Sequence, residues 1–484
     1  MTTLTLQGRR LEVASGTALK DVLFEEGIEF PCGGRGRCGK CRVRLTAGAL
    51  DPQTEDRAVL GAEALAQGWR LACRHRLDAD LALDVGQWQM DVLADDRAFA
   101  FAPQAGLGIA IDLGTTTIAA QLVDREKGRV LRAATALNAQ ARYGDDVVSR
   151  LEATLSGRDV TGVIRDQLGR MVQELAGGEA VHRIVIVGNT AMHHLFCGFD
   201  VRTLATYPFA PIHPGRVRCS AADLGWPLDG PAIVEVLPCI GGMVGADILA
   251  GVMATRLHEQ AGLAALIDLG TNGEVVVARD GRLLAASTAA GPAFEGARIS
   301  CGMRAASGAI SEVAVADGSL ACRVIGGGEA RGLCGSGLVD AVAAGLDLGR
   351  IESSGHLAEP LALTGRVALQ PRDVRELQLA KAAIAAGLRL LTTRFGATPA
   401  DIAMLHLAGA FGNTVNRVSA RRIGLLQLPV ERILPAGNTA LLGAKLALFE
   451  DEAWDGMARR IEHVPLNEEP AFEEMFAEEM RFPD

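Results

Sequence analysis

Four cysteines near the N-terminus have the spacing of an iron–sulfur ligand set. They follow a C-x5-C-x2-C pattern with the fourth cysteine after 31 intervening residues, and they are Cys32, Cys38, Cys41 and Cys73. Because each iron of a [2Fe-2S] cluster takes two cysteine thiolates, four cysteines suffice. Glycines between them let the backbone curl tightly and direct N–H groups at the cluster sulfides. The pattern predicts a one-electron carrier at the start of a chain of 484 residues, which is far too long to be only a carrier.

Two other uses of these cysteines stay open on spacing alone. A structural zinc site also takes four thiolates, but usually as two C-x2-C pairs, and only Cys38 and Cys41 form such a pair. Disulfides are less expected, because residues 1–13 lack the apolar core of a secretion signal. These residues predict two strands around a turn at Gly8, and residues 17–27 predict a short amphipathic helix.

Residues 1–85 resemble the plant-type and adrenodoxin-type ferredoxins. Plant-type ferredoxins have four residues between the first two cysteines, whereas this chain has five, which is similar to the adrenodoxin-type loop. The resemblance implies an α+β domain of β-grasp fold that holds a [2Fe-2S] cluster. Basic residues surround the cysteines, and they form either a docking face for an acidic electron partner or an ordinary solvated face. They are Arg35, Arg37, Lys40, Arg42 and Arg44.

Composition narrows the class of the remaining chain. Its length predicts two or three domains, and 49% hydrophobic residues with only 4% aromatic residues favour a glycine-rich α/β enzyme. A net charge of −10 argues against a nucleic-acid partner. No apolar stretch reaches the roughly 18 residues of a membrane span, so we expect no membrane partner. The six other cysteines are scattered, as expected for core thiols in the reducing cytoplasm.

Changes in pattern divide the chain into five segments. We expect a ferredoxin domain over 1–85, a linker over 86–105, a first α/β lobe over 106–262 and a second lobe over 263–465. The linker shows no sustained period and has about 20 residues, so we expect it to be mobile. Residues 466–484 are rich in glutamate and predict an acidic, solvated extension.

A repeat in the second part has the chemistry of a phosphate clamp. Two similar runs begin at Gly108 and Ala264, and each predicts a strand, an Asp-Leu-Gly-Thr turn, a strand, a polar turn and a strand. Asp112 and Asp268 occupy matching places, 156 residues apart, which indicates duplicated domains. An aspartate at a strand end can hold Mg²⁺ through water or direct a nucleophilic water. The turn residues would contact ATP phosphates; they are Gly114, Thr115, Thr116, Thr117, Gly270, Thr271, Asn272 and Gly273.

Three further segments have the order expected of a nucleotide site with a hinge. Residues 236–254 and 437–450 predict helices rich in small residues, which would allow close packing of the two helices. Residues 404–424 predict an apolar strand, a glycine-rich turn and a helix. A strand that enters a glycine turn at a helix N-terminus suits the sugar and α-phosphate of a nucleotide, so Gly409 and Gly412 are expected to line the nucleoside pocket.

These segments resemble the motifs of the actin, sugar-kinase and heat-shock-chaperone superfamily of ATPases. DLGTTT is similar to its first phosphate motif, DLGTNG to its second, and LAGAFG to its adenosine motif. The resemblance implies an α/β fold of two duplicated RNase-H-like lobes that close on ATP and Mg²⁺. It implies catalytic functions for Asp112, as a Mg²⁺ residue, and for Asp268, in positioning Mg²⁺ or the attacking water.

A ferredoxin fused to such an ATPase resembles the reductive activators of corrinoid proteins. The runs VGNTAMHHLFCG, GPAFEGARISCGMRA, GLCGSGLVDAV and DVRELQLAKAAI are also similar to that family. The resemblance implies ATP-dependent reactivation of a corrinoid (cobalamin) methyltransferase protein from Co(II) to Co(I), with the [2Fe-2S] domain delivering the electron. It implies a corrinoid-binding partner and an upstream reductase or ferredoxin, and it is compatible with a homodimer because dimers occur in the superfamily.

Two other functions stay open, and some residues in these runs are weaker candidates for chemistry. The chain could donate electrons to another metalloenzyme, as dehydratase activators do, or it could be an ATP-regulated binding module with a redox-sensing cluster. Adjacent residues His193 and His194 point in different directions on a helix, so we expect helix surface or core rather than cobalt ligands. Glu295 is either a water-orienting acid or a helix cap, and Ser336 is expected in a turn or at a helix start.

Overall fold

The computed structural model describes most of the chain as two compact units. The described residues are 1–6, 9–25, 34, 36, 41–85, 99–144, 146–270, 272–296, 298–450 and 453–484. The first unit comprises Met1–Met90, Thr115–Thr117 and Ala136–Gln167, and the second comprises Asp91–Gly114, Ile118–Thr135 and Leu168–Asp484.

The N-terminal domain is built on a five-stranded sheet. Its strand order is β2-β1-β7-β4-β5, with β1 antiparallel to β2 and parallel to β7. Alternate side chains of β1 are buried, as expected for a strand with one face on a core, and Leu4 packs in one cluster with Leu19 and Leu23 of α1. The two strands and the helix predicted here are confirmed, and the turn at Gly8 lies outside the described residues. The elements are β1 (Thr2–Leu6), β2 (Arg9–Val13), β3 (Thr17–Ala18), α1 (Leu19–Glu25), β4 (Arg42–Ala47), α2 (Thr54–Ala66), β5 (Trp69–Leu71), β6 (Arg76–Leu77) and β7 (Leu81–Val85).

The first ATPase lobe is built on a six-stranded sheet in the order β10-β9-β8-β11-β13-β12. Strand β8 is antiparallel to β9 and parallel to β11, which is parallel to β13. Its strands are β8 (Leu107–Leu113), β9 (Thr117–Asp124), β10 (Arg129–Leu137), β11 (Val181–Val187), β12 (Val217–Ser220) and β13 (Ile233–Val236). Its helices are α3 (Val147–Leu155), α4 (Val160–Ala176), α5 (Thr190–Cys197), α6 (Arg202–Ala205) and α7 (Ala246–Thr255).

The second lobe repeats this topology. Its main sheet has the order β23-β22-β14-β15-β16-β24, so its first three strands form an antiparallel meander and its next two lie parallel to the first, as in the other lobe. This repetition confirms the duplicated fold. The strands are β14 (Ala264–Leu269), β15 (Gly273–Arg279), β16 (Arg282–Thr288), β22 (Met404–Ala408), β23 (Ile433–Gly437) and β24 (Ile461–His463).

Two smaller sheets, β18-β17-β19 and β20-β21, and several helices complete the second lobe. The smaller strands are β17 (Ala309–Ala316), β18 (Ser319–Val324), β19 (Gly332–Leu333), β20 (Leu361–Thr364) and β21 (Val367–Leu369). The helices are α8 (Gly335–Asp347), α9 (Pro371–Thr393), α10 (Gly409–Gly412), α11 (Arg417–Arg422), α12 (Thr439–Ala447), α13 (Ala453–Arg460) and α14 (Pro470–Glu479). Within the described part of the chain, no helix has both the length and the apolar character needed to cross a membrane.

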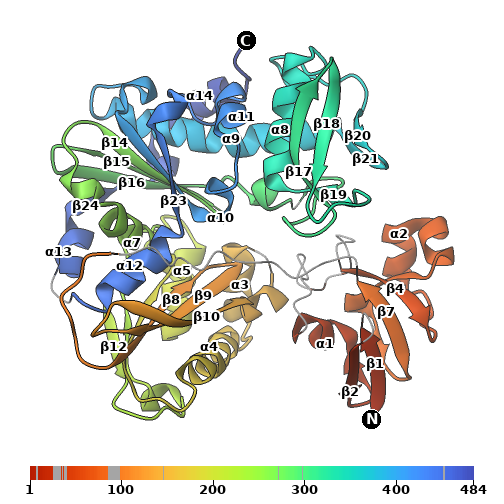
Figure 1. The fold of residues 1–484 in the computed structure, drawn as a ribbon, viewed down its shortest axis with the longest axis horizontal. Coiled ribbons are helices and arrows are strands. Elements are labelled where there is room, and N and C mark those ends of the chain that lie inside the picture. Colours follow the sequence, from red (N-terminus) through yellow and green to blue (C-terminus); the bar gives the residue numbers. More distant parts are fainter. Residues whose placement is uncertain are drawn as a thin grey trace. The chain divides into compact units, whose positions relative to one another are not determined.

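Helices α7 and α12 lie side by side between the two six-stranded sheets (Figure 1). Their small residues permit this approach, because a Cβ on Gly443 would come within 2.5 Å of the Ala250 Cβ. The prediction of a helix over 236–254 is correct only for its second half. Val236 ends β13, and the helix begins at Ala246, since Pro238 and the glycines that follow do not favour a continuous helix.

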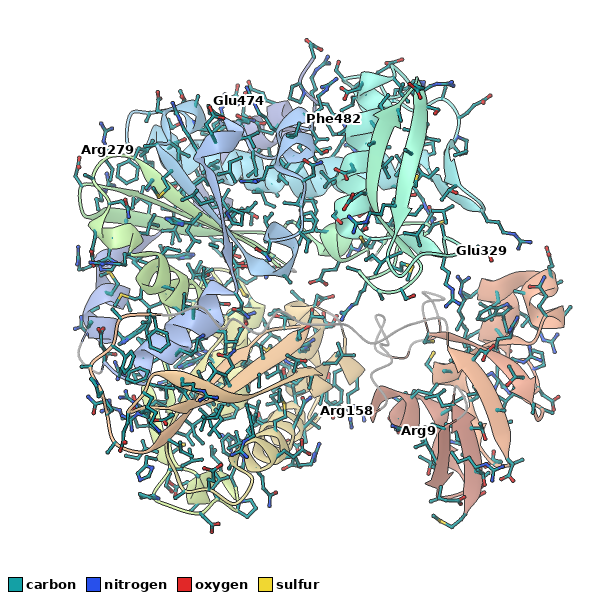
Figure 2. All side chains as sticks on the ribbon, in the orientation of Figure 1. Arg9, Arg158, Arg279, Glu329, Glu474 and Phe482 are labelled. Carbon is teal, nitrogen blue, oxygen red and sulfur yellow. The ribbon has the colours of Figure 1, made fainter. Side chains whose placement is uncertain are left out.

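The C-terminal segment packs against the second lobe, so the prediction of a solvated tail is wrong. Phe482, labelled in Figure 2, is only 3% exposed and belongs to the core of this lobe. The Nζ of Lys381 donates to the Arg481 carbonyl at 2.5 Å, and the Nε2 of Gln378 donates to the Met480 carbonyl at 2.8 Å. Apolar residues spaced between the glutamates therefore bury one face of the segment, although its net charge suggested a solvated chain.

Candidate functional site

Asp112 and Asp268 stand at equivalent places near the ends of β8 and β14, the first strands of the two repeats. The structure brings the two carboxylates close enough for Asp112 to repel Asp268. Asp112 has one strong partner, because the Asn438 Nδ2 donates to its Oδ2 at 2.9 Å. The two aspartates are therefore near each other, as expected for a common site. Their functions in that site stay predictions.

Burial raises the pKa of both aspartates. The pKa of Asp112 rises to about 6, because the loss of water outweighs the hydrogen bond from Asn438. The pKa of Asp268 rises to about 7, first through burial and then through the negative charge of Asp112. The two carboxylates are therefore poorly solvated anions, and an added cation would stabilise them.

Two further carboxylates join this cluster, and sequence reasoning missed both. Asp247, in the first turn of α7, has its pKa raised to about 8 by burial and by repulsion from Asp268. Glu274, on β15, has its pKa raised well above its usual range by burial and by repulsion from Asp247, and it accepts a hydrogen bond of 3.1 Å from the Ser287 Oγ. Each is a lone acid in an otherwise apolar run, and such a buried charge needs a partner. A lone acid within an apolar run was therefore the feature of the sequence that could have revealed Asp247 and Glu274.

The four-carboxylate cluster (Asp112, Asp247, Asp268 and Glu274) suits a hydrated divalent cation. Among the residues that the structure describes, no three His, Cys, Asp or Glu side chains have the spacing of direct ligands to one metal ion. Mg²⁺ usually keeps several of its waters and takes only one or two carboxylates. The cluster therefore fits Mg²⁺ held largely through water.

Glycines in and beside the second phosphate turn make contacts that exclude a side chain. Gly409 has φ +85°, and a Cβ there would lie 2.5 Å from the Asp268 Oδ1 and 2.6 Å from the Leu269 carbonyl oxygen. Gly273 lies under α9, where a Cβ would come within 2.6 Å of Ile384. The amide of Gly270 donates to the Asn272 carbonyl at 3.0 Å and closes the turn. Thr271 lies outside the described residues.

The other predicted nucleotide residues lie in the expected turns. Gly114 follows β8, and Thr117 begins β9. Thr115 is buried, and the carbonyl of Thr116 accepts a hydrogen bond of 2.9 Å from the Asn138 amide. Gly412 ends the short helix α10, and a Cβ there would come within 3.2 Å of Leu407. Their contacts with ATP stay predictions.

An aromatic pair fixes the turn after β22, and the sequence did not reveal it. The rings of Phe294 and Phe411 stack with their centroids 4.5 Å apart and their planes 19° apart. Phe411 belongs to α10, and Phe294 to a 3₁₀ turn over Pro292–Glu295. The stack therefore ties the predicted adenosine turn to the segment that contains Glu295. Such pairs contribute about 0.5–1.5 kcal/mol beyond their burial.

Two of the predicted cluster ligands lie in the described part of the N-terminal domain. Cys41 is buried just before β4, and Cys73 lies in a 3₁₀ turn over Ala72–Arg74. The Ala72 amide donates to the Cys41 carbonyl at 3.0 Å, which ties these two segments together. A Cβ on Gly34 would lie 3.6 Å from the Cys73 Cβ, so this glycine lies close to Cys73. This arrangement fits a shared metal cluster; Cys32 and Cys38 lie outside the described residues.

A buried aspartate supports the turn that carries Cys73. Asp56 accepts hydrogen bonds from the Gln53 and Leu71 amides, each at 2.7 Å, and pairs with the His75 Nε2 at 2.8 Å. It thus joins the start of α2 to both sides of the Cys73 turn. No local motif announced this contact, because the paired residues come from separate elements.

Two of the basic residues near the cluster cysteines contact other residues of the N-terminal domain. Arg44 forms an ion pair of 2.9 Å with Asp84, and Arg42 lies over the Trp69 ring at 5.4 Å. These two side chains are therefore partly engaged within the domain. Arg35, Arg37 and Lys40 lie outside the described residues, so the docking-face hypothesis stays a prediction.

The weaker candidates His193, His194 and Ser336 have contacts typical of structural residues. His193 and His194 on α5 are both buried; the His193 Nε2 lies 3.1 Å from the Gly215 carbonyl oxygen, and burial lowers the pKa of His193 to about 4. Their predicted place on a helix surface or in a core is confirmed as core. Ser336 lies in the first turn of α8, where its Oγ donates to the Ser311 carbonyl, so its predicted place at a helix start is confirmed.

Comparison with known proteins gives the class of this chain. A family model described as a 2Fe-2S iron–sulfur cluster binding domain matches residues 3–78. A model of the RACo middle region matches residues 107–260, and one of the C-terminal, ASKHA domain of RACo matches residues 262–484. The chain therefore joins a [2Fe-2S] domain to an ATPase of the actin and sugar-kinase class. The first match supports a [2Fe-2S] cluster rather than zinc in the N-terminal domain.

Individual relatives narrow the class to one family. The corrinoid activation enzyme RamQ of Eubacterium limosum is 32% identical over 422 residues, which cover 78% of this chain and 70% of the relative. A [Co(II) methylated amine-specific corrinoid protein] reductase of Methanosarcina barkeri is 30% identical and covers 72% of this chain and 71% of its own length. A solved reductive activator for corrinoid, iron–sulfur protein has a TM-score of 0.70 and 26% identity, over 100% of this chain and 98% of that chain. The chain belongs to the family of reductive activators of corrinoid proteins.

Proposed function

We propose that this protein uses ATP to reduce the Co(II) form of a corrinoid methyltransferase protein to Co(I). The observation that carries the proposal is the four-carboxylate cluster, to which both repeats contribute, in the same chain as a [2Fe-2S] domain. The membership of the chain in the reductive activator family supports a corrinoid protein as the partner.

The need for ATP follows from the direction of the electron transfer. The [2Fe-2S] cluster, when bound, supplies one electron, and plant-type clusters have potentials near about −400 mV. For a one-electron step, each 59 mV uphill makes the equilibrium about tenfold less favourable. A corrinoid that is harder to reduce than the cluster therefore needs an ATP-dependent change in the complex. ATP can supply this change if it binds two conformations of the protein with different affinities.

The described residues support separate functions in ATP hydrolysis. Asp112 and Asp268 would hold Mg²⁺ through water, and the turn glycines and threonines would position the phosphates, since phosphoryl transfer depends mainly on positioning and charge stabilisation. Gly409 leaves space for the Asp268 carboxylate. Without a cation the pKa of Asp247 is raised to about 8; a bound cation would lower this pKa and leave a carboxylate able to accept the proton of the attacking water.

We also propose an electron donor, a cell compartment and an oligomeric state for this protein. We expect an upstream reductase or ferredoxin to reduce the cluster, because the chain needs a new electron for every cobalt that it reduces. We place the reaction in the cytoplasm, where ATP is available, without a nucleic acid or membrane partner. A homodimer is expected from the superfamily, and light scattering on the purified protein tests it.

The direct test uses the full chain, a low-potential reductant, MgATP and purified Co(II) corrinoid proteins. We expect the Co(II) electron paramagnetic resonance signal to disappear and Co(I) absorbance to appear only when ATP is present. A protein without ATP and a protein with ATP but no reductant are the two controls. If cobalt stays Co(II) with every corrinoid partner while ATP is hydrolysed, the proposed function is wrong.

A further inference from the structure

The last seven residues of the segment that leads from the ferredoxin domain are held against α12. The rings of Phe99 and Phe101 lie 5.4 and 4.9 Å from the Phe449 ring, and 5.6 Å from each other. The Nζ of Lys445, in the last turn of α12, lies 5.7 Å from the centroid of the Phe99 ring. The mobile linker predicted over 86–105 is therefore wrong for residues 99–105, which pack against the core of the second unit.

A buried arginine adds polar contacts to this anchor. The Arg125 Nη1 donates to the Ala105 carbonyl at 3.0 Å, and its Nε donates to the Leu448 carbonyl at 3.2 Å. The Gln104 amide donates in turn to the Arg125 carbonyl at 2.9 Å. One side chain thus joins the end of the linker to the C-terminal end of α12, where helix carbonyls lack partners within the helix.

The backbone beside the anchor leaves space for one of its aromatic rings. Gly128, in the turn between β9 and β10, has φ +64°, and a Cβ built there would lie 2.2 Å from the Phe101 ring. A larger residue at this position would displace Phe101. The aromatic contacts, the arginine contacts and the space at Gly128 are independent features of the chain, and each favours the same placement of the linker.

The opposite end of α12 contacts the carboxylate cluster. Asn438 caps the helix, because its Oδ1 accepts a hydrogen bond of 2.8 Å from the Leu441 amide. Its Nδ2 donates to the Asp112 Oδ2 at 2.9 Å. A helix rises 1.5 Å per residue, so about 15 Å separate Asn438 from Leu448. One short helix therefore contacts the candidate nucleotide site at its start and the linker at its end.

We propose that Asn438 is a positioning residue and that α12 couples the nucleotide site to the anchor of the ferredoxin linker. A bound nucleotide with its cation changes the partners of Asp112. Since the same amide side chain binds Asp112 and caps α12, the start of the helix shifts with it. The helix then moves as a unit against α7, and its end displaces Leu448 and Phe449 from their contacts with the linker. This inference rests on the proposed nucleotide site, and it adds a route from ATP to the electron donor.

Hydrogen–deuterium exchange on the full-length protein tests the coupling without any corrinoid partner. The reporter is the Gln104 amide, which is held by Arg125, in a peptide that covers residues 99–107. We expect a saturating non-hydrolysable ATP analogue with Mg²⁺ to change the exchange rate of this peptide at least threefold. If the analogue is bound, as shown by titration, and the rate stays the same, the coupling is wrong.

The variant Asn438→Ser separates the two hydrogen bonds of Asn438, one to Asp112 and one that caps α12. Serine caps a helix about as well as asparagine, but it is too short to donate to Asp112. We expect the variant to keep α12 folded and to lose the nucleotide-dependent change at residues 99–107, at a nucleotide concentration shown to saturate the variant. A change as large as in the wild type would overturn the assignment of Asn438.

Phe101→Ala tests the anchor at a distance from the nucleotide site, and Phe472→Ala is its matched control. Phe472 is a partly buried phenylalanine on α14. We expect fast exchange at Gln104 with and without nucleotide in Phe101→Ala, ATP hydrolysis within twofold of the wild type, and wild-type exchange in Phe472→Ala. A preserved nucleotide response in Phe101→Ala contradicts the proposal. Because exchange needs no cobalt, a normal response without Co(I) formation would refute the proposed function alone.

Discussion

Asp112 and Asp268 hold the same place in two copies of one sheet, yet Asp112 has a neutral amide partner and Asp268 lies beside other carboxyl groups. Asp112 receives a hydrogen bond from the Asn438 amide, and its pKa rises only to about 6. Asp268 faces the backbone of Gly409 and repels Asp247, and its pKa rises to about 7. Duplication thus produced two equivalent positions that now differ in what they need from a ligand.

The difference comes from the helices that follow the sheets. Helix α7 starts after Gly245 and places Asp247 in its first turn, whereas α12 starts after Gly437 and places Asn438 at its cap. The acid places a second carboxyl group beside Asp268, and because the two groups repel each other when both are ionised, that end of the cluster depends most on a cation. The amide satisfies Asp112 without a ligand, so that end can respond when a ligand arrives. We infer that one half mainly binds the charge of Mg-nucleotide and that the other half senses it.

The largest expected effect is that of removing the carboxylate with the greater need for a cation. Asp268→Ala should keep the visible spectrum of the cluster and lower ATP-dependent cobalt reduction by about 100-fold or more, as loss of a catalytic carboxylate typically does. Stopped-flow absorbance of Co(I) measures the rate. Asp166→Ala, on the exposed face of α4, is the control and should leave the rate unchanged. Retained activity in Asp268→Ala would remove the catalytic function that we assign to this residue.

A smaller effect is expected from crowding Asp268 rather than removing it. In Gly409→Ala the new Cβ would lie 2.5 Å from the Asp268 Oδ1, so the carboxylate or the turn must move. We expect Mg-nucleotide affinity to fall about tenfold, which corresponds to about 1.4 kcal/mol. Calorimetric titration measures the affinity. Gly396→Ala is a matched control, because Gly396 also has positive φ (+66°) but has no atom within 4 Å of the added Cβ.

The control separates two costs of the same substitution. Both alanines adopt a left-handed backbone, which costs roughly 1–2 kcal/mol of stability, but only the one at position 409 meets the carboxylate. Equal nucleotide affinities in the two variants would show that Gly409 serves only the backbone. The contrast between Asp112 and Asp268 would then rest on Asn438 and Asp247 alone.

The sequence predicted the duplicated sheets well because their signals are local. Alternating apolar residues, a DLGT turn and a polar turn lie within about 25 consecutive residues of each repeat, and these signals fix strand order through short connections. The placement of Asp112 and Asp268 near strand ends followed directly. The cysteine spacing was equally local, and the match to a 2Fe-2S domain agrees with it.

The features that the sequence did not predict depend on contacts between segments far apart in the chain. Asn438 and Asp112 are 326 residues apart in the chain, so no spacing rule could pair them. The linker anchor joins Phe101 to Phe449, and the tail joins Phe482 to the core of the second lobe. In both cases a few aromatic residues decide the packing, while the surrounding composition suggested a loop or a solvated helix.

The smallest expected effect concerns the charge that α7 adds beside Asp268. In the nucleotide-free protein the pKa of Asp247 is raised to about 8 from its usual 3.8, so the folded state binds a proton that the unfolded state has already lost. Its contribution to stability is full below about pH 4 and is lost as pH rises through about 8. Asp247→Asn removes this loss, so the variant should gain stability relative to the wild type between pH 5 and pH 8.

One pKa unit corresponds to about 1.4 kcal/mol, but the Asp247 side chain keeps some surface exposed to solvent. Solvent screening therefore removes most of the effect of the shift, and we expect a gain on the order of 1 kcal/mol. For a chain of 484 residues, whose unfolding entropy is about 2.1 cal/mol/K per residue, that raises Tm by about 1 °C at pH 8, measurable by circular dichroism in EDTA. Asp112→Asn is the comparison: the pKa of Asp112 rises only to about 6, and the variant alters the contact with Asn438, so its gain should be smaller or absent. Equal gains in the two variants would mean that the two halves of the site share one electrostatic environment, and the division between binding and sensing would fail.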